Sequence, residues 1–444
     1  MTCRGPADPP LCTGCLSKDT RRRCTYCSLY GPIWRSKFGL FDIVNVATPD
    51  LIAQVIQQEG RYPVRAELPH WKEYRDLRGQ AYGLHVETGL DWYRLRSALN
   101  PKMLKLQEVS AYASVIHQVV GDLLQRIELL RTCSQDQATV SDLAAELYKF
   151  GFEGVSSILF ETRLGCLQEE IPHDTLRFIA AVNDMLTFSD PVLLFPRWSR
   201  DILPFWKRFI QAWDDLSDIA QMLIDRRMAE IEAQVSRGEP AEGMYLTYLL
   251  SSDKLSKADV YTSVTELMLG GVDTVRKKND TVVWFFTSVE LDLFAFSSTS
   301  LYPVVPGNGR YISENEVILD NYWFPKKTQF HLCHYAACHD ESEFVDAERF
   351  LPERWFYSEA PSSRSNRAMP GFYQHHPYSF IPFGVGVRAC VGKRVAEMEM
   401  HFALSRLMQH YEIQPEDGAP TVEAKTRTLL IPSKPINLRF MPRA

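Results

Sequence analysis

The sequence predicts a single large domain that is mainly α-helical, with a smaller β portion. Apolar residues recur at spacings of three and four up to about residue 275, which is the period of helices that bury one face. Between residues 301 and 350, proline and glycine instead separate short alternating runs, which are typical of strands. The helical period returns over Val391–Tyr411. We therefore expect a helix-rich body that carries a smaller sheet region.

The start of the chain differs from the rest. Residues 1–29 are rich in Cys, Pro and Arg and have no apolar period, so we expect them to be unstructured and the domain to occupy residues 30–444. Within the domain, Val140–Thr162 predicts a long helix with one almost entirely apolar side. Another helix is expected to begin near Ser256, because Ser256 and Asp259 have the spacing of a capping box.

The later elements follow from the same patterns. The run Gln329–Tyr335 alternates in polarity and predicts a strand, and Thr428–Phe440 predicts a hairpin. The helix Val391–Tyr411 carries a continuous apolar stripe that we expect to face the core. The stripe consists of Ala396, Met400, Ala403, Leu404, Leu407 and Tyr411.

Composition excludes several classes of protein. Of the 444 residues, 45% are hydrophobic and 23% are charged, which excludes disorder, collagen and coiled coil as descriptions of the whole chain. The net charge of −6 offers no overall electrostatic attraction for nucleic acid, so we expect no nucleic-acid partner. The sequence has no run of about 18 uncharged apolar residues, so we expect no membrane-spanning helix.

Cysteine is unevenly distributed, with five of the ten cysteines in the first 27 residues. Four of these have paired spacings that are compatible with a zinc site, but the middle spacer is short and no globular core accompanies them, so an unstructured start is the favoured interpretation. The four are Cys12, Cys15, Cys24 and Cys27. The pairs Cys333-His334 and Cys338-His339 are a second candidate metal cluster, for which strand and loop positions are the simpler interpretation.

The most informative segment is Phe383–Gly392, a glycine-rich loop that presents Cys390 just before a helix. Its glycines permit sharp turns and close approach to a flat ligand. The free N–H groups and dipole of the helix N-terminus favour the thiolate form of Cys390. A thiolate can be the axial ligand of haem iron, and Arg388 suits a haem propionate. Two other interpretations are weaker. Residues 384–389 loosely match a dinucleotide-binding fingerprint, but the βαβ unit that this fingerprint requires is missing. A buried structural cysteine would not explain why Phe, Gly, Arg and Cys occur together at these spacings.

This segment resembles the haem-ligand signature Phe-x-x-Gly-x-Arg-x-Cys-x-Gly of the cytochrome P-450 monooxygenases. Similarity runs from about Tyr30 to the C-terminus. The resemblance implies the family's triangular, mainly helical fold, with haem b between a long central helix and the helix that follows Cys390. Cys390 would ligate the iron, and Phe383 and Gly386 would belong to the haem-binding loop.

Other positions of the family pattern are carried over one by one. Asp273 and Thr274 resemble the acid and hydroxyl of the central helix that deliver protons during dioxygen cleavage, which needs such donors. Trp92 and Arg96 resemble an early-helix pair that contacts a propionate, and Arg310 resembles a further propionate partner beside Arg388. Phe350–Trp355 is similar to the family's Pro-Glu-Arg segment, in which Arg354 would join an ion-pair triad.

Further strings resemble the mitochondrial sterol and vitamin D hydroxylase branch. They include Leu203–Arg208 and Arg163–Leu167. The segment Glu146–Gly151 resembles the corresponding sequence of enzymes that hydroxylate 25-hydroxyvitamin D at carbon 1. Arg61–Arg65 instead resembles the sterol 26-hydroxylases, which remain the alternative. The branch implies a secosteroid or sterol substrate and a mitochondrial location at the matrix side of the inner membrane with peripheral membrane contact, although no clear transit peptide is visible.

The branch also implies electrons from a mitochondrial ferredoxin and its reductase. Lys393 and Arg394, just past the haem cysteine, would offer a basic docking spot for the acidic ferredoxin. A solvated helix face is the plainer interpretation of two basic residues side by side.

Residues 275–300 depart from the family pattern. The family's Glu-x-x-Arg pair falls on Ser297 and Ser300, and the stretch is too short for the helices that normally precede Leu301. Arg354 would thereby lose the partners that the family uses. This departure predicts a second possibility, an inactive splice product that retains haem weakly or not at all.

Overall fold

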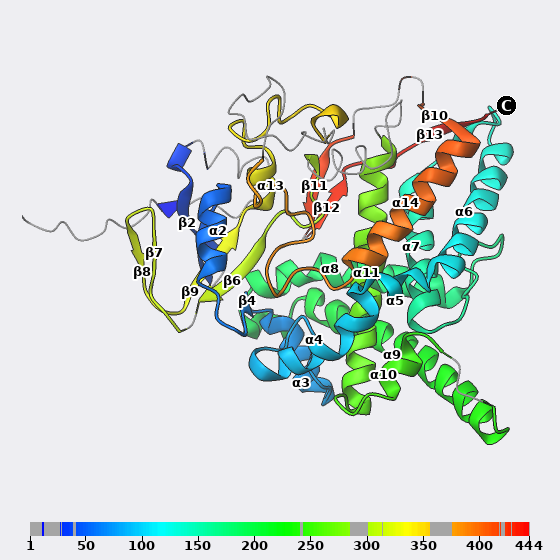
Figure 1. Ribbon diagram of the computed structural model, residues 1–444, viewed down its shortest axis with the longest axis horizontal. Coiled ribbons are helices and arrows are strands. Elements are labelled where there is room, and N and C mark those ends of the chain that lie inside the picture. The colour runs from blue at the N-terminus through cyan, green and yellow to red at the C-terminus, as the bar shows by residue number, and fades with distance from the viewer. Residues whose placement is uncertain are drawn as a thin grey trace, which may run out of the picture.

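The computed structural model has a helical body on one side and a β-sheet region on the other (Figure 1). It describes residues 11–12, 27, 29–38, 41–239, 243–284, 301–312, 314–355, 375–416, 418, 422–427 and 429–443. The predicted mainly helical architecture with a smaller β portion is confirmed. Among these residues, no helix combines the length and apolar character needed to cross a bilayer.

Most of the helices lie between residues 49 and 284, and one follows the Cys390 loop. They are α2 (Pro49–Gln57), α3 (Pro69–Arg78), α4 (Gly89–Leu104), α5 (Leu106–Ser110), α6 (Ala113–Cys133), α7 (Leu143–Leu159), α8 (His173–Leu194), α9 (Pro204–Ser236), α10 (Leu246–Leu250), α11 (Lys257–Trp284), α13 (His334–Cys338) and α14 (Lys393–His410). Two 3₁₀ turns accompany them, η1 (Arg197–Asp201) and η2 (Pro352–Trp355).

The main sheet combines four strands from the N-terminal part of the chain with two strands from residues 308–332. It has six strands in the order β1-β2-β3-β9-β6-β4, and Figure 1 shows the blue N-terminal strands beside the yellow-green later ones. Its strands are β1 (Leu11–Cys12), β2 (Ile33–Phe38), β3 (Phe41–Val46), β4 (Val64–Arg65), β6 (Asn308–Ile312) and β9 (Thr328–Leu332). β3 and β9 run parallel, whereas β6 runs antiparallel to both of its neighbours, β9 and β4.

Smaller sheets complete the β portion. β7 (Val317–Leu319) pairs with β8 (Tyr322–Phe324), and β11 (Ala424–Arg427) pairs with β12 (Leu429–Pro432). The third sheet has the order β10-β13-β5. Its strands are β10 (Tyr411–Pro415), β13 (Leu438–Pro442) and β5 (Thr139–Val140).

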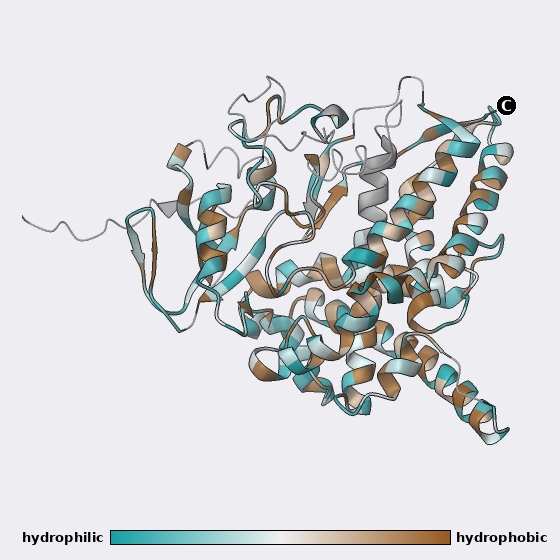
Figure 2. Ribbon diagram, viewed as in Figure 1, coloured by the Kyte–Doolittle hydropathy of each residue, from teal (hydrophilic) through white to brown (hydrophobic). Residues whose placement is uncertain are grey.

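The principal core lies between the long helices. α7 is buried along nearly its whole length, because α6, α8 and α11 pack around it. Its contact with α11 is so close that a Cβ on Gly271 would lie 2.6 Å from Val155 Cγ2. The more exposed helices alternate apolar and polar faces, as the brown and teal bands in Figure 2 show. A second apolar cluster fills the space between α2 and the main sheet.

Three helix predictions are confirmed. The segment Val140–Thr162 contains α7, and α11 begins at the predicted cap, where Ser256 Oγ accepts from the Asp259 amide at 3.1 Å and Asp259 Oδ2 accepts from the Ser256 amide at 2.9 Å. The predicted apolar stripe is buried along α14, although its last member, Tyr411, is the first residue of β10. α11 also continues beyond the expected end near residue 275, to Trp284.

Two β predictions are wrong in part. The strand predicted at Gln329–Tyr335 ends at Leu332, and residues 334–335 begin α13. The hairpin predicted at Thr428–Phe440 does not form, because β12 pairs with β11 and β13 pairs with β10 and β5. The partner of each strand here is a segment distant in the sequence, and the local alternation of apolar and polar residues does not identify that partner.

The start of the chain was expected to be unstructured. Within residues 1–29 the structure describes β1, which pairs in parallel with β2, and residues 27 and 29, where Gly31 N–H donates to the Cys27 carbonyl at 2.9 Å. Cys15 and Cys24 lie outside the described residues, so the zinc alternative stays untested. Within the described residues, no group of three or more His, Cys, Asp or Glu side chains is placed to hold a metal ion.

Candidate functional site

The loop before α14 presents Cys390 at the helix N-terminus. Gly384 and Gly386 adopt φ values of +70° and +76°, a region that side chains with a Cβ rarely enter, and these turns fold the loop back on itself. The Cys390 amide donates to the Phe383 carbonyl at 2.8 Å, and α14 begins at Lys393. The Cys390 side chain is exposed rather than packed in the core. The sulfur is therefore available to a ligand.

Three predicted arginines converge on this loop. Arg96 of α4 donates to the Ala389 carbonyl at 2.7 Å, and Arg310 of β6 donates to the Val385 carbonyl at 3.2 Å. Arg388 itself donates to the carbonyls of Pro63, at 2.5 Å, and Glu87, at 3.0 Å. Elements far apart in the sequence thus place their guanidinium groups around one segment.

Trp92 lies beside the arginines of this cluster. Its buried ring is against the guanidinium of Arg388, with 4.1 Å between Arg388 Cζ and the ring centroid. This cation–π contact helps to orient Arg388. The contact of Trp92 with a haem propionate, together with Arg96, stays a prediction.

Two residues of this cluster were missed by the sequence analysis. Arg65 belongs to β4, whose register with β6 sets it opposite Arg310, and Glu59 forms an ion pair with Arg310. Arg65 stood in the string Arg61–Arg65, which was used only to judge the branch. Its role depends on strand pairing, and no local signal in the sequence reports that pairing.

The arginines repel one another. Burial, together with the charges of Arg310 and Arg96, lowers the pKa of Arg65 to about 10. Burial and the charges of three neighbouring arginines lower the pKa of Arg388 to about 9. Among the described residues, Arg96 Nε has no hydrogen-bond partner. An anionic group among these cations would relieve the repulsion and take up the free donor, so the cluster fits the two carboxylates of a haem.

The central helix supplies Thr274. Its hydroxyl donates to the Gly270 carbonyl at 2.5 Å, a bond to the preceding turn that tends to bend a helix. The Asp273 side chain lies outside the described residues, so its predicted role stays a prediction. α11 and α14 pack against each other, which places the helix that carries Thr274 beside the helix that follows Cys390.

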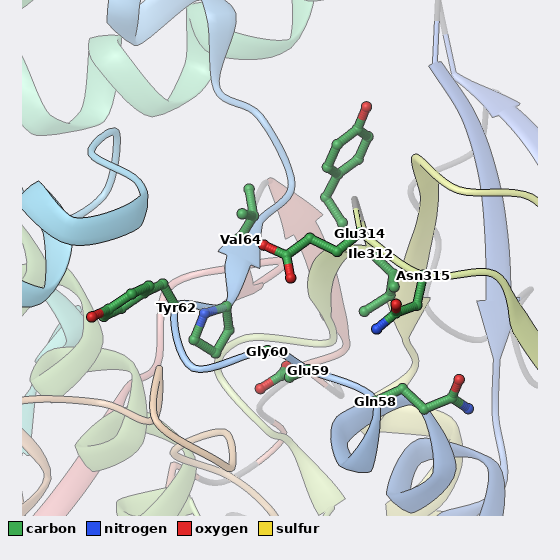
Figure 3. A pocket seen from close by; sticks show the side chains of 10 residues that line it. Gln58, Glu59, Gly60, Tyr62, Val64, Ile312, Glu314 and Asn315 are labelled. Carbon is green, nitrogen blue, oxygen red and sulfur yellow. The ribbon is translucent and has the colours of Figure 1, made fainter.

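Figure 3 shows a pocket beside this cluster, between the end of α2, β4 and β6. Glu59 and Tyr62 contribute to its wall, and Glu314 and Asn315 lie on the other side. Its volume is about 30 Å³, which is room for about one water molecule. It is too small for a sterol or a porphyrin, and we assign it no ligand.

The protein-family model described as Cytochrome P450 matches residues 20–287 and 301–440. The chain belongs to the cytochrome P450 family. The match begins earlier than Tyr30, and its gap at residues 288–300 falls inside the segment predicted to depart from the family. The predicted class of enzyme, a cytochrome P450 monooxygenase, is confirmed. The family implies a haem iron cofactor, which the cluster around the Cys390 loop fits.

Relatives match the branch indicated by the sequence motifs. The P450 chain is 38% identical to the mitochondrial sterol 26-hydroxylase of Rattus norvegicus, over 93% of this chain and 82% of that protein. It is 35% identical to the mitochondrial 25-hydroxyvitamin D-1 alpha hydroxylase of Homo sapiens, over 99% of this chain and 92% of that protein. A crystal structure of a cytochrome P450 superposes with a TM-score of 0.77 at 19% identity, covering 99% of this chain and 100% of that one, which supports the fold.

Ser297 and Ser300, the positions where the sequence analysis expected the family's Glu-x-x-Arg pair, lie outside the described residues. The structure does describe Arg354, which the sequence analysis placed in an ion-pair triad. Its guanidinium donates to four backbone carbonyls, and it holds the segment before η2 through these bonds. The acceptors are Leu351, Val345, Asp346 and Arg349.

Proposed function

We propose that this P450 hydroxylates 25-hydroxyvitamin D at carbon 1, with haem b as cofactor and electrons from a mitochondrial ferredoxin and its reductase. The convergence of Arg65, Arg96, Arg310 and Arg388 on the Cys390 loop supports the haem site. Similarity along 99% of the chain to a 25-hydroxyvitamin D-1 alpha hydroxylase supports the substrate. The relatives' names support a mitochondrial location, which we propose to be the matrix side of the inner membrane.

The residues of the site have distinct parts in this proposal. Cys390 would ligate the iron, and the arginines would hold the propionates. When bound, the haem supplies the dioxygen chemistry that inserts one oxygen atom into a C–H bond, while two electrons and two protons convert the other atom to water. The Thr274 hydroxyl, held by the Gly270 carbonyl, would move protons together with Asp273.

A product assay tests the substrate. The purified chain, reconstituted with haem, ferredoxin and reductase, is given 25-hydroxyvitamin D and cholesterol in parallel, and products are identified by mass spectrometry. We expect 1-hydroxylation of 25-hydroxyvitamin D as the faster reaction. Loss of haem from the wild-type chain, with no product from either substrate, would support the inactive splice product instead.

The second candidate is a sterol 26-hydroxylase. The 38% identity to the rat sterol 26-hydroxylase favours it, as does the string Arg61–Arg65, whose last residue belongs to the arginine cluster. Side-chain hydroxylation of cholesterol as the faster reaction in the same assay would select this candidate and exclude the first.

Lys393 and Arg394 are proposed to dock the ferredoxin. Both side chains are about half exposed at the start of α14, next to the Cys390 loop, and both contact Glu397. Reversing both charges to Glu is expected to raise the KM for ferredoxin about tenfold, with kcat at saturating ferredoxin unchanged, because exposed charges act mainly on association. Lys326→Glu with Lys327→Glu, the same charge change on the β8–β9 turn, is the control. Equal KM values for both double variants would contradict the docking site.

An apolar patch between α8 and α9 supports peripheral membrane contact. Trp198 and Ile202 are 72% and 73% exposed, and Phe195 is 48% exposed. Trp198→Ser with Ile202→Ser is expected to weaken binding to phospholipid vesicles tenfold or more, since burying such a side chain contributes about 1.5–3 kcal/mol. Trp323→Ser with Ile318→Ser on the β7–β8 hairpin is the matched control. Sedimentation with vesicles measures both, and equal losses would exclude a specific patch.

A further inference from the structure

A buried carboxylate lies in α11, eight residues before Thr274. Glu266 is 1% exposed. Its Oε2 accepts from the backbone N–H of His85 at 2.9 Å and lies 3.0 Å from His85 Nδ1. Burial alone would raise the pKa of Glu266, but the hydrogen bond from His85 and the charges of His85 and Arg75 hold the pKa below its usual range. The carboxylate is therefore a charged acceptor inside the protein.

The segment before α4 is built to approach this carboxylate. A Cβ on Gly83 would lie 2.3 Å from Glu266 Cδ, so only glycine allows the backbone to come this close. Arg75, at the end of α3, faces the same group with 3.7 Å between Arg75 Nη2 and Glu266 Oε1. The ring of Trp213 in α9 covers the guanidinium of Arg75 at 4.7 Å. Glu266 thus joins α11 to the end of α3 and to residues 79–88, which we call the α3–α4 loop.

The other end of the α3–α4 loop touches the candidate haem site. The Glu87 amide donates to the Gly83 carbonyl at 2.8 Å, which closes a short turn between the two ends. The Glu87 carbonyl accepts from Arg388 Nη2 at 3.0 Å. Glu266 and Arg388 are therefore connected through this one turn, which donates to Glu266 from His85 and accepts from Arg388 at Glu87. α4, which carries Arg96, starts two residues after Glu87.

We propose that Glu266 is a positioning residue, which anchors the α3–α4 loop to the central helix and through Glu87 holds Arg388 beside the Cys390 loop. This inference rests on the proposed function, because Arg388 is a propionate partner there. Loss of the anchor frees the loop, and Arg388 then loses a fixed acceptor. The bound haem dissociates faster as a result.

The competing explanation is that Glu266 only neutralises the buried charge of Arg75. Glu266→Met removes both the anchor and the neutralising charge. The double variant Glu266→Met with Arg75→Met removes the unpaired cation together with the anchor, and with it the hydrogen bond that Arg75 donates to Gln80 of the loop. Gly83→Ala pushes the loop away from the carboxylate without changing any charge.

Glu161 provides the matched control. Its side chain is 4% exposed, pairs with Arg227 at 2.8 Å, and accepts the backbone N–H of Met244 at 2.6 Å. None of these contacts belongs to the α3–α4 loop. Glu161→Met therefore removes a similar set of interactions elsewhere in the fold.

Hydrogen–deuterium exchange of residues 83–88 in the full chain is the deciding measurement. In Glu266→Met, in Gly83→Ala and in the double variant, we expect exchange to rise about tenfold or more, since local opening becomes easier. Haem transfer to apomyoglobin is expected to accelerate in the same three variants. Glu161→Met should change exchange around residue 244 and leave residues 83–88 at the wild-type rate.

Two results would overturn the proposal. Wild-type exchange of residues 83–88 in the double variant would mean that Glu266 merely balances Arg75. Equal acceleration of haem transfer in Glu161→Met and in the double variant would mean that any buried Glu has this effect. If the wild-type chain takes up no haem, the proposed function fails, while the exchange measurement still decides whether Glu266 anchors the loop.

Discussion

Cys390→Ser is expected to abolish the spectral signature of a thiolate-ligated haem and to reduce hydroxylation to background. A serine hydroxyl stays protonated at neutral pH and cannot replace a thiolate as the electron-donating axial ligand. Because the Cys390 side chain is exposed and supports no core packing, the free energy of unfolding of the haem-free chain should change by less than about 0.5 kcal/mol. The absorption spectrum of the reduced carbon monoxide complex, read beside haem content per chain, measures the effect.

Cys133→Ser is the control for this prediction. Cys133 is a second exposed cysteine, at the end of α6. The control variant should keep the wild-type spectrum and rate. A Cys390→Ser chain that retained both would remove the basis for the entire assignment of the site.

Glu399→Gln is expected to remove a large part of the pH dependence of stability. Glu399 lies on α14 with 1% exposure, and neither carboxylate oxygen has a hydrogen-bond partner among the described residues. A Cβ on Gly154 of α7 would lie 2.7 Å from Glu399 Oε1, so the carboxyl is pressed against the neighbouring helix. Burial raises the pKa of Glu399 from 4.5 to about 8. The folded chain therefore holds this proton at neutral pH, and the unfolded chain does not.

The direction follows from proton linkage. The contribution of protonated Glu399 to the free energy of unfolding is complete below pH 4.5. It decreases as the pH rises to about 8 and stays at its low value above that pH. Over that window it amounts to a loss on the order of 5 kcal/mol, since one pKa unit corresponds to about 1.4 kcal/mol. Denaturant unfolding between pH 5 and 9 measures the free energy of unfolding of wild type and variant.

The slope against pH, rather than the stability at one pH, decides this prediction, because a glutamine amide is also buried without partners. Glu397→Gln, which removes a more exposed carboxylate from the same helix, should keep the wild-type slope. Parallel curves for wild type and Glu399→Gln would show that Glu399 does not titrate in this window.

The residues of the site could be predicted from the sequence where they belong to one short motif. Residues 383–392 carry the ligand and the turns that present it, and Arg388 belongs to the same string. Trp92 and Arg96 are four residues apart on α4, so they share one face, but the sequence does not say that Trp92 stacks on Arg388. Arg65 could not be found, because its position depends on the register of β4 with β6, which joins segments 245 residues apart.

The fold shows the same division. α7, α11 and α14 were predictable because burial of one helix face repeats every three to four residues within the segment itself. β12 and β13 were correctly predicted to be strands. Their partners were predicted wrongly, because each strand pairs with a segment other than the one expected. Helical hydrogen bonds close locally, whereas each strand depends on another part of the chain.

The parallel pairing of β3 with β9 has a consequence for synthesis. Val46 and Leu332 are paired residues separated by 286 positions, so the N-terminal hairpin leaves the ribosome long before its neighbour exists. At about 5–20 residues per second, the delay is about 15–60 s. During that time the apolar edge of β3 is open to other chains. This sheet edge therefore stays unpaired until residues 328–332 have been made.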